Sequence, residues 1–156
     1  MILYLVRSAA GGMQRHVLAL LNHFGQRYPV GLALPRGENW AAEEARNFRL
    51  SLSAGFSPGR DLLSCWRCYL LLRKVRPALL HIHGFKTFLV GAPAARLAGA
   101  PVLVTVHNFP AHQSGMIMLP PLSRLSALAG AHYIAVSGVY EALTAGSQKT
   151  KRRGMD

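Results

Sequence analysis

Acidic side chains are scarce in this sequence. Six Asp and Glu residues stand against 18 Lys and Arg residues, which gives a formal net charge of +12, and beyond Asp61 the only acids are Glu141 and Asp156. This imbalance indicates an anionic partner, whether nucleotide phosphates, a lipid surface or nucleic acid. Basic residues are dispersed, however, and no basic motif interleaved with aromatic residues is present. We therefore predict no nucleic-acid partner.

Cysteine is nearly absent as well. Cys65 and Cys68 form a Cys-x-x-Cys inside a helical pattern, and no second pair completes a zinc site. We expect two ordinary helix thiols in a reducing compartment.

Arg7 interrupts the apolar opening, and no basic segment precedes it, so no signal peptide is predicted. The uncharged stretch 97–123 contains several prolines and polar side chains, so we do not expect it to span a membrane.

Strand-like and helix-like segments alternate along the chain, which predicts an α/β fold: a Rossmann-like parallel sheet with helices on both faces. One domain is expected over 1–146, followed by a basic, disordered tail over 147–156. The predicted strands are 2–6, 28–34, 78–83, 101–106 and 132–136, with a short one at 50–53. The predicted helices are 13–24, one starting at Asp61 as N-cap and stopping before Pro77, 85–98, and further segments at 40–48, 116–129 and 138–143.

A glycine turn joins the first strand to the first helix. Gly11 and Gly12 would point unpaired backbone N–H groups at the end of the sheet, which favours an anion. The turn lacks both the G-x-G-x-x-G fingerprint and the Walker lysine, so neither a standard NAD site nor a P-loop is supported. Gln14, Arg15 and His16 follow directly. A polar first turn at this edge is where a diphosphate and a sugar hydroxyl would be held.

Two later strands end in histidine. His81 and His83 alternate so that both lie on one face of their strand, and His107 follows the next strand directly. One reading is a metal site made by these three side chains, although no carboxylate lies near them in the sequence. Another is that His81 is an ordinary core residue, whereas His83 reaches a ligand. His107, with Asn108 opening a polar loop behind it, suits a polar contact or a proton-transfer role.

Four motifs together resemble the N-terminal domain of glycosyltransferase family 4. They are the runs 11–17 (GGMQRHV), 76–84 (RPALLHIHG), 101–108 (PVLVTVHN) and 133–137 (YIAVS), in the right order and spacing. The resemblance implies a GT-B architecture, in which two Rossmann-like domains face each other across a cleft. The N-terminal domain mainly binds the acceptor, and the C-terminal domain binds the nucleotide sugar.

The resemblance also implies roles for particular residues. Gly11 and Gly12 match the glycine turn that approaches the donor diphosphate, and the range 14–16 (Gln14, Arg15, His16) matches the helical turn that faces the acceptor. His83 matches the second histidine of the strand-end motif, and His107 matches the histidine near the transferred sugar, which makes it the catalytic candidate. Asn108 and Ser137 complete the expected acceptor side, and no metal is expected.

The function implied is that of the acceptor-binding half of a nucleotide-sugar-dependent glycosyltransferase. It would transfer a hexose to a cell-envelope polysaccharide or a lipid-linked acceptor in the cytoplasm, at the inner face of the membrane. The nucleotide sugar is then a co-substrate, and no cofactor is expected. We expect the chain to be inactive without a C-terminal, donor-binding domain, as a truncated product or one half of a split enzyme. Two alternatives remain: a non-catalytic membrane-surface or protein-interaction module, and a small metal-dependent hydrolase using His81, His83 and His107.

Overall fold

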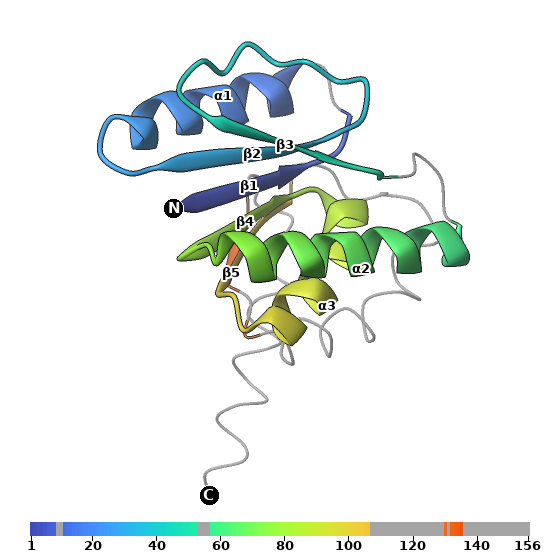
Figure 1. Cartoon of the computed structure of the whole chain (residues 1–156). Helices are drawn as coiled ribbons and strands as arrows, with labels where there is room; N and C mark the ends of the chain where they lie inside the picture. Colours follow the sequence, from blue (N-terminus) through green and yellow to red (C-terminus); the bar gives the residue numbers. More distant parts are fainter. Residues whose placement is uncertain (9–10, 53–56, 107–129, 131, 136–156) are drawn as a thin grey trace, which may run out of the picture.

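A computed structural model describes residues 1–8, 11–52, 57–106, 130 and 132–135 of the chain. Strands and helices follow one another as the alternating pattern predicts (Figure 1). In chain order they are β1 (Ile2–Val6), α1 (Gly12–Gly25), β2 (Val30–Pro35), β3 (Arg46–Leu50), α2 (Pro58–Val75), β4 (Leu79–His83), α3 (Phe85–Ala98), β5 (Val102–Val106) and β6 (His132–Ala135).

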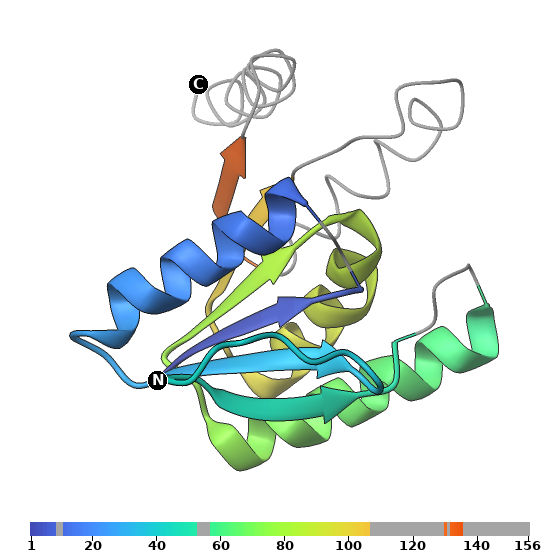
Figure 2. The same ribbon diagram turned by 90° about the horizontal axis from the view of Figure 1, so that it is seen from above.

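The strands form one parallel sheet in the order β3-β2-β1-β4-β5-β6. The chain first builds outward from β1 through β2 to β3, then returns to place β4 on the other side of β1. In this pairing Tyr4 lies beside His81, and Val6 lies beside His83. Figure 2 shows the strands side by side and twisted, as parallel strands are. The predicted parallel α/β sheet is therefore confirmed.

Helices cover both faces of this sheet. Alternate residues of β1 point to opposite sides: Leu3 and Leu5 pack in the core beneath α2 and α3, whereas Tyr4 and Val6 pack against α1. Figure 1 shows α1 on one side and the α2–α3 pair on the other. Because both faces of β1 are buried, its sequence is a continuous run of apolar residues at 2–6.

Most predicted boundaries are close to those observed. The strand at 2–6 and the helix at 85–98 are confirmed, and α3 ends at Gly99, which adopts the left-handed conformation with φ of 70°. The second strand begins at Val30 rather than residue 28 and includes Pro35. Predictions for 108–115, 116–129, 138–143 and the tail 147–156 lie outside the described residues.

The predicted helix at 40–48 is wrong. Residues 40–45 form no helix and contain a turn at 43–44, and the strand β3 begins at Arg46, which also corrects the short strand predicted at 50–53. The reason is tertiary: β3 pairs with β2, and Trp40 and Ala42 are buried in the core beneath α1. Pairing and burial outweigh a weak helical preference. The charged residues of β3 suit an edge strand, because they discourage pairing with another chain.

Asp61 is also placed differently from the prediction. The N-cap of α2 is Ser57, and Asp61 lies one turn later, where its carboxylate accepts a hydrogen bond from the Ser57 backbone N–H at 3.1 Å. The same carboxylate binds Lys86 of α3 at 3.1 Å. Asp61 therefore joins the first turns of α2 and α3, which both begin at the carboxyl edge of the sheet.

Candidate functional site

The candidate site lies where the strand order reverses, at the carboxyl ends of β1 and β4. In open parallel sheets this switch point is where ligands bind, because the loops after the two strands diverge there. Gly11 follows the first strand and Gly84 follows the second, with φ angles of 77° and 87° respectively. Residues with side chains rarely adopt these angles, so both turns depend on glycine.

The start of α1 forms one side of the site. Gly11 is its N-cap, and no side-chain cap is formed there among the described residues. A Cβ added at Gly11 or Gly12 would meet nothing within 4 Å, so the space before the helix is open. The first turn contains no acid, and Arg15 is exposed. Free N–H groups, a helix dipole and a cation at one helix start suit an anion.

Three histidines gather at this edge. The ring of His16, from α1, lies 5.9 Å from the ring of His83 at the end of β4, measured between centroids. His83 in turn lies 4.2 Å from His81. His16 is exposed, whereas His83 is fully buried. The structure thus brings together His16 and His83, which the sequence placed on separate elements, with His16 on the outside. Ligand binding by His83 stays a prediction.

His81 belongs to the interior. Its side chain is 4% exposed, and its Nε2 lies 2.8 Å from the Thr105 Oγ1, which is completely buried on β5. A buried imidazole needs such a partner, because an unpaired polar atom in the core costs free energy. The interpretation of His81 as a core histidine is confirmed.

Two further residues of this cluster were not predicted. Tyr4 lies beneath the histidines, with its ring centroid 5.3 Å from His81 and 6.1 Å from His83. Burial raises the pKa of the Tyr4 hydroxyl to about 12, because the charged phenolate is disfavoured in the core. Thr105 is the other. The sequence did contain a signal for both residues. Tyr4 and Thr105 are the hydroxyl-bearing residues of the otherwise apolar strands β1 and β5, and strand alternation puts them on the same face of the sheet as His81 and His83.

The remaining predicted residues divide into two groups. Gln14 is half-buried in the first turn of α1. His107, Asn108 and Ser137 lie outside the described residues. In the described part of the chain no three His, Cys, Asp or Glu side chains are grouped to hold a metal ion. The metal hypothesis required His107 as its third ligand, so it is not tested by that observation.

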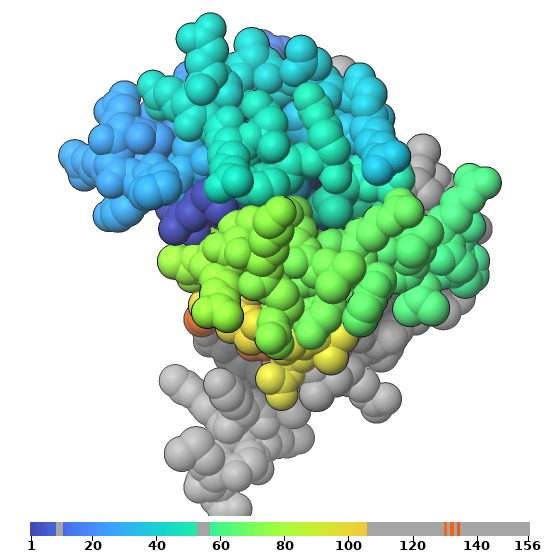
Figure 3. All heavy atoms as spheres, viewed as in Figure 1, coloured from blue at the N-terminus to red at the C-terminus, as the bar shows by residue number. Residues whose placement is uncertain are grey.

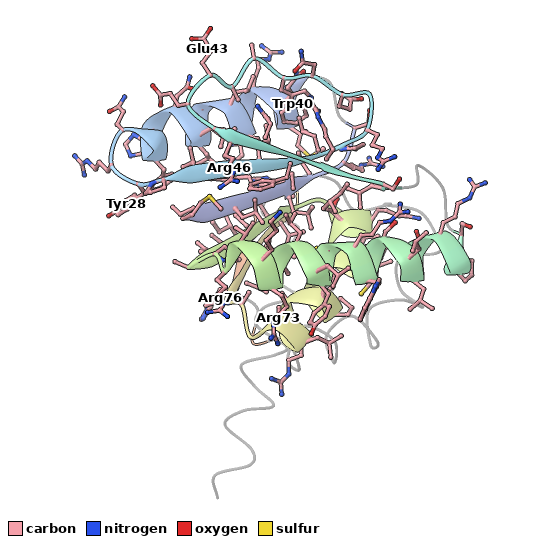
Figure 4. All side chains as sticks on the ribbon, viewed as in Figure 1. Tyr28, Trp40, Glu43, Arg46, Arg73 and Arg76 are labelled. Atoms are coloured by element: carbon pink, nitrogen blue, oxygen red, sulfur yellow. The ribbon has the colours of Figure 1, made fainter. Side chains whose placement is uncertain are left out.

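Two hollows in the described surface are lined by no histidine. One is at the opposite edge of the sheet, where α2 and α3 end, and is lined by Arg73, Arg76 and Gly99 among others. Figure 4 labels the two arginines there. The other is a narrow crevice beside Arg7, Lys86 and Thr87 at the carboxyl edge. Parallel sheets bind ligands at the carboxyl edge, so the first hollow, at the amino edge, is not where a ligand is expected in this fold.

Comparison with known proteins identifies the family. The sequence profile of Glycosyltransferase Family 4 matches residues 10–153. An Escherichia coli protein, UDP-Gal:alpha-D-GlcNAc-diphosphoundecaprenol alpha-1,3-galactosyltransferase, is 45% identical over 51 residues, which are 32% of this chain and 13% of the relative. That match spans a small part of the relative, whereas the profile spans nearly the whole chain.

Solved structures share the fold. The lipopolysaccharide outer core galactosyltransferase WaaB superposes with a TM-score of 0.65 at 13% identity, covering 94% of this chain and 42% of that one. Alr3699/HepE from Anabaena, solved with UDP and glucose, gives a TM-score of 0.58 at 18% identity, covering 80% and 35% respectively. The chain thus spans less than half the length of these structures.

The profile and the fold agree with the observed site. The order of the strands reverses at β1, which is followed by the glycine turn, and the neighbouring strand β4 ends in a histidine. Both features belong to the motifs that resemble the family. Structures this distant show the fold alone, whereas the profile identifies the family. The chain therefore belongs to glycosyltransferase family 4, and its described residues form a Rossmann-like sheet of the kind found in GT-B glycosyltransferases.

Proposed function

We propose that this chain is the acceptor-binding half of a nucleotide-sugar-dependent glycosyltransferase, which transfers a hexose to a cell-envelope polysaccharide or a lipid-linked acceptor. The observation that carries the proposal is the juxtaposition at the switch point: the open start of α1 at Gly11 lies at the same edge as His16 and His83. The E. coli relative supports the substrate class, since its name specifies a UDP-hexose donor and a diphosphate-linked lipid acceptor.

The chemistry requires an anion to be held at this edge. In transfer, an acceptor hydroxyl oxygen forms a bond to the anomeric carbon, the bond from that carbon to the nucleotide diphosphate breaks, and the hydroxyl proton leaves. The departing diphosphate gains negative charge, which backbone N–H groups at Gly11 and Gly12 would stabilise. Gln14, Arg15 and His16 would hold the acceptor by hydrogen bonds and charge. These donors stand on a helix, and a helix orients them rigidly.

The loops after the later strands would complete the site. His107 comes directly after β5, next to β4 in the sheet, and we assign it to the transferred sugar as the catalytic candidate. Asn108 and Ser137 are assigned to the acceptor side with His83. An imidazole with a pKa near neutral suits the hydroxyl proton. The nucleotide sugar is the co-substrate, and the proposal requires no cofactor.

A second domain is part of the proposal. Transfer requires the donor to be positioned against the acceptor, and one Rossmann-like domain provides one wall of a two-domain cleft. We propose that the 156 residues alone transfer no sugar, and that a donor-binding domain, on the same or a separate polypeptide, restores transfer. We further propose that the reaction takes place in the cytoplasm, at the inner face of the membrane, where the proposed lipid-linked acceptor would be bound.

The proposal is tested by acceptor binding to the 156-residue chain. The probe is a GlcNAc-diphosphate carrying a short alkyl tail, titrated by isothermal calorimetry at low and high salt. We expect binding that weakens with salt, and a loss of about ten-fold in affinity for Arg15→Gln, which removes a charged contact. Arg27→Gln, an exposed arginine beyond the other end of α1, is the matched control.

Three outcomes would overturn the proposal. One is that the probe does not bind to a chain whose circular dichroism shows it to be folded. Another is that Arg15→Gln and Arg27→Gln weaken binding equally, which would mean that only net charge matters. The third is a stoichiometric metal in the purified protein together with hydrolysis that depends on His81 and His83, which would favour the hydrolase alternative.

A further inference from the structure

The helix α2 exposes an unusual number of large apolar side chains. Leu62 is 73% exposed, Leu63 47%, Trp66 55% and Leu70 49%. These four residues, called the α2 outer face below, are more than half of the large apolar side chains exposed on the described surface. Scattered apolar residues on a surface are normal, but a contiguous group marks a contact.

Helical spacing places these residues together. Leu62, Trp66 and Leu70 follow one another at four-residue intervals, which puts them on one side of the helix, with Leu63 alongside. The opposite side carries Ser64, Cys68 and Leu72, which are buried against the sheet and α3. The helix therefore has two apolar sides, and only one of them is used by the fold. Figure 3 shows α2, in green, running across the front of the molecule with no other described segment over it.

A row of cations borders this face. Arg60, Arg67 and Lys74 are exposed and lie seven residues apart, about two helical turns, so they form a line along the helix. The acid of this helix, Asp61, lies toward α3 and is bound to Lys86 at 3.1 Å. The exposed charges beside the apolar face are therefore all positive.

We propose that the α2 outer face docks on a membrane surface that carries anionic lipid headgroups. Apolar side chains including a tryptophan would enter the boundary between headgroups and acyl chains, and the cation row would lie at the level of the headgroups. A second copy of this chain fits less well, because a two-fold contact through this face would bring two cation rows together. In the described part of the chain, no helix has the length and apolar character that crossing a membrane requires.

Docking through α2 would bring the carboxyl edge of the sheet close to the membrane. Because α2 follows β3, it starts at the carboxyl edge of the sheet and runs back toward the amino edge (Figure 1). Leu62 and Leu63 are in its first turns, at the edge that carries Gly11 and His16. A lipid-linked acceptor in the bilayer would be presented to the candidate site from this side. This benefit rests on the proposed function, whereas the docking itself depends on neither donor nor acceptor.

The charge part of the proposal is tested by vesicle flotation with the 156-residue chain. Vesicles of phosphatidylcholine alone are compared with vesicles containing 30% phosphatidylglycerol. We expect binding to the anionic vesicles that decreases with salt. Arg60→Gln combined with Arg67→Gln should lower the partition coefficient by about 30-fold, since each cation near such a surface contributes roughly five-fold. Arg27→Gln combined with Arg36→Gln removes the same charge elsewhere and should lower it far less.

The apolar part is tested by fluorescence. Trp40 is 3% exposed and Trp66 is 55% exposed, and these are the two tryptophans of the chain. In a Trp40→Phe background, Trp66 emission should shift to the blue on anionic vesicles and be quenched by brominated lipids. Leu62→Ser should weaken binding by about ten-fold or more, because it replaces an apolar side chain that the bilayer would bury with a polar one. Tyr28→Ser changes another exposed large side chain, beyond α1 and labelled in Figure 4, and this variant should bind like the wild-type chain.

Several results would overturn the proposal. One is that the two double charge variants lower flotation equally. Another is that Trp66 emission stays unchanged while the protein floats with anionic vesicles. A third is a dimer in lipid-free solution that Leu62→Ser dissociates, which would assign the face to a second copy. Each variant is first checked for its thermal midpoint. Since no sugar or donor is present, failure here leaves the acceptor-binding test unaffected, and failure there leaves the vesicle result standing.

Discussion

Replacement of Gly91 by alanine should destabilise the protein, although alanine is the better helix former. Gly91 lies in the middle of α3, where the helix presses on the sheet. A Cβ at this position would lie 2.8 Å from the Leu5 Cδ2 and 2.9 Å from the Ile82 Cδ1. Both side chains are completely buried, so neither can move without displacing other core residues.

Two opposing effects set the size of the change. Alanine gains about 1 kcal/mol in helix propensity over glycine. Overpacking of a filled core costs about 1–3 kcal/mol, and two contacts this short place Gly91→Ala in the upper part of that range. We expect a net loss of about 1–2 kcal/mol in the free energy of unfolding, which lowers the melting temperature by roughly 2–8 °C in a chain of this size.

Urea unfolding followed by circular dichroism measures the change, with Gly59→Ala as the matched control. Gly59 is also helical, in the first turn of α2, but a Cβ there meets nothing within 4 Å. That variant should be neutral or more stable by up to about 1 kcal/mol. If Gly91→Ala proves as stable as the unchanged chain, α3 does not pack on the sheet as closely as described, and the reasoning fails.

Three further predictions concern stability. Arg76 caps α2 with φ of 48°, so Arg76→Gly should raise the free energy of unfolding by about 0.5–1 kcal/mol in urea titrations, whereas unchanged stability would contradict this conformation. Thr105→Val leaves the His81 Nε2 without its hydroxyl partner and should cost about 1–3 kcal/mol, measured in the same way; a neutral result would mean that the bond is not formed. Burial, with a smaller effect of its neighbouring thiol, raises the pKa of Cys68 from 9.0 to about 12, and burial raises that of Tyr4 from 10.0 to about 12. The folded chain then keeps protons that the unfolded chain loses, so stability should fall as pH rises from about 9 to 12, and less steeply in Cys68→Ala with Tyr4→Phe.

The sheet could be predicted because its signals are local. A strand that is buried on both faces needs a mainly apolar run: β1 is apolar throughout, whereas β4 is apolar apart from its two histidines and β5 apart from Thr105. The start of α3 after Gly84 and its end at Gly99 follow from glycine preferences that act within a few residues. These elements form where local preference and the fold agree.

The wrong assignments share the opposite cause. Residues 40–48 have the composition of a helix, but Trp40 and Ala45 are needed in the core under α1, and β2 offers Arg46–Leu50 a pairing edge. Neither fact is visible in the segment itself. Asp61 looks like an N-cap by residue type, yet Pro58 extends the helix back by one turn and gives that role to Ser57.

The candidate site was predictable by residue type but not by arrangement. Gly11 and His83 could be placed at one edge because parallel strands end together. That the His16 ring would lie beside His83 depends on the position of α1 over the sheet. That Tyr4 would lie beside His81 and His83 depends on the pairing of β4 with β1. The exposure of Trp66 was hidden for a similar reason, because an apolar residue in an amphipathic helix is expected to face the core.

The topology explains why the start of α1 and the start of α2 lie at the same edge of the sheet but on opposite faces. The chain reverses between β3 and β4, so α1 lies on one face and α2 on the other, and both helices begin at the carboxyl edge. The open start of α1 offers backbone N–H groups to an anion, whereas the start of α2 is occupied by Asp61 and Lys86. One helix start is thus available for a ligand, and the other is closed by the protein's own ion pair. A membrane on the α2 outer face would therefore lie beside the open turn at Gly11 without covering it, which is the geometry that an acceptor anchored in lipid requires.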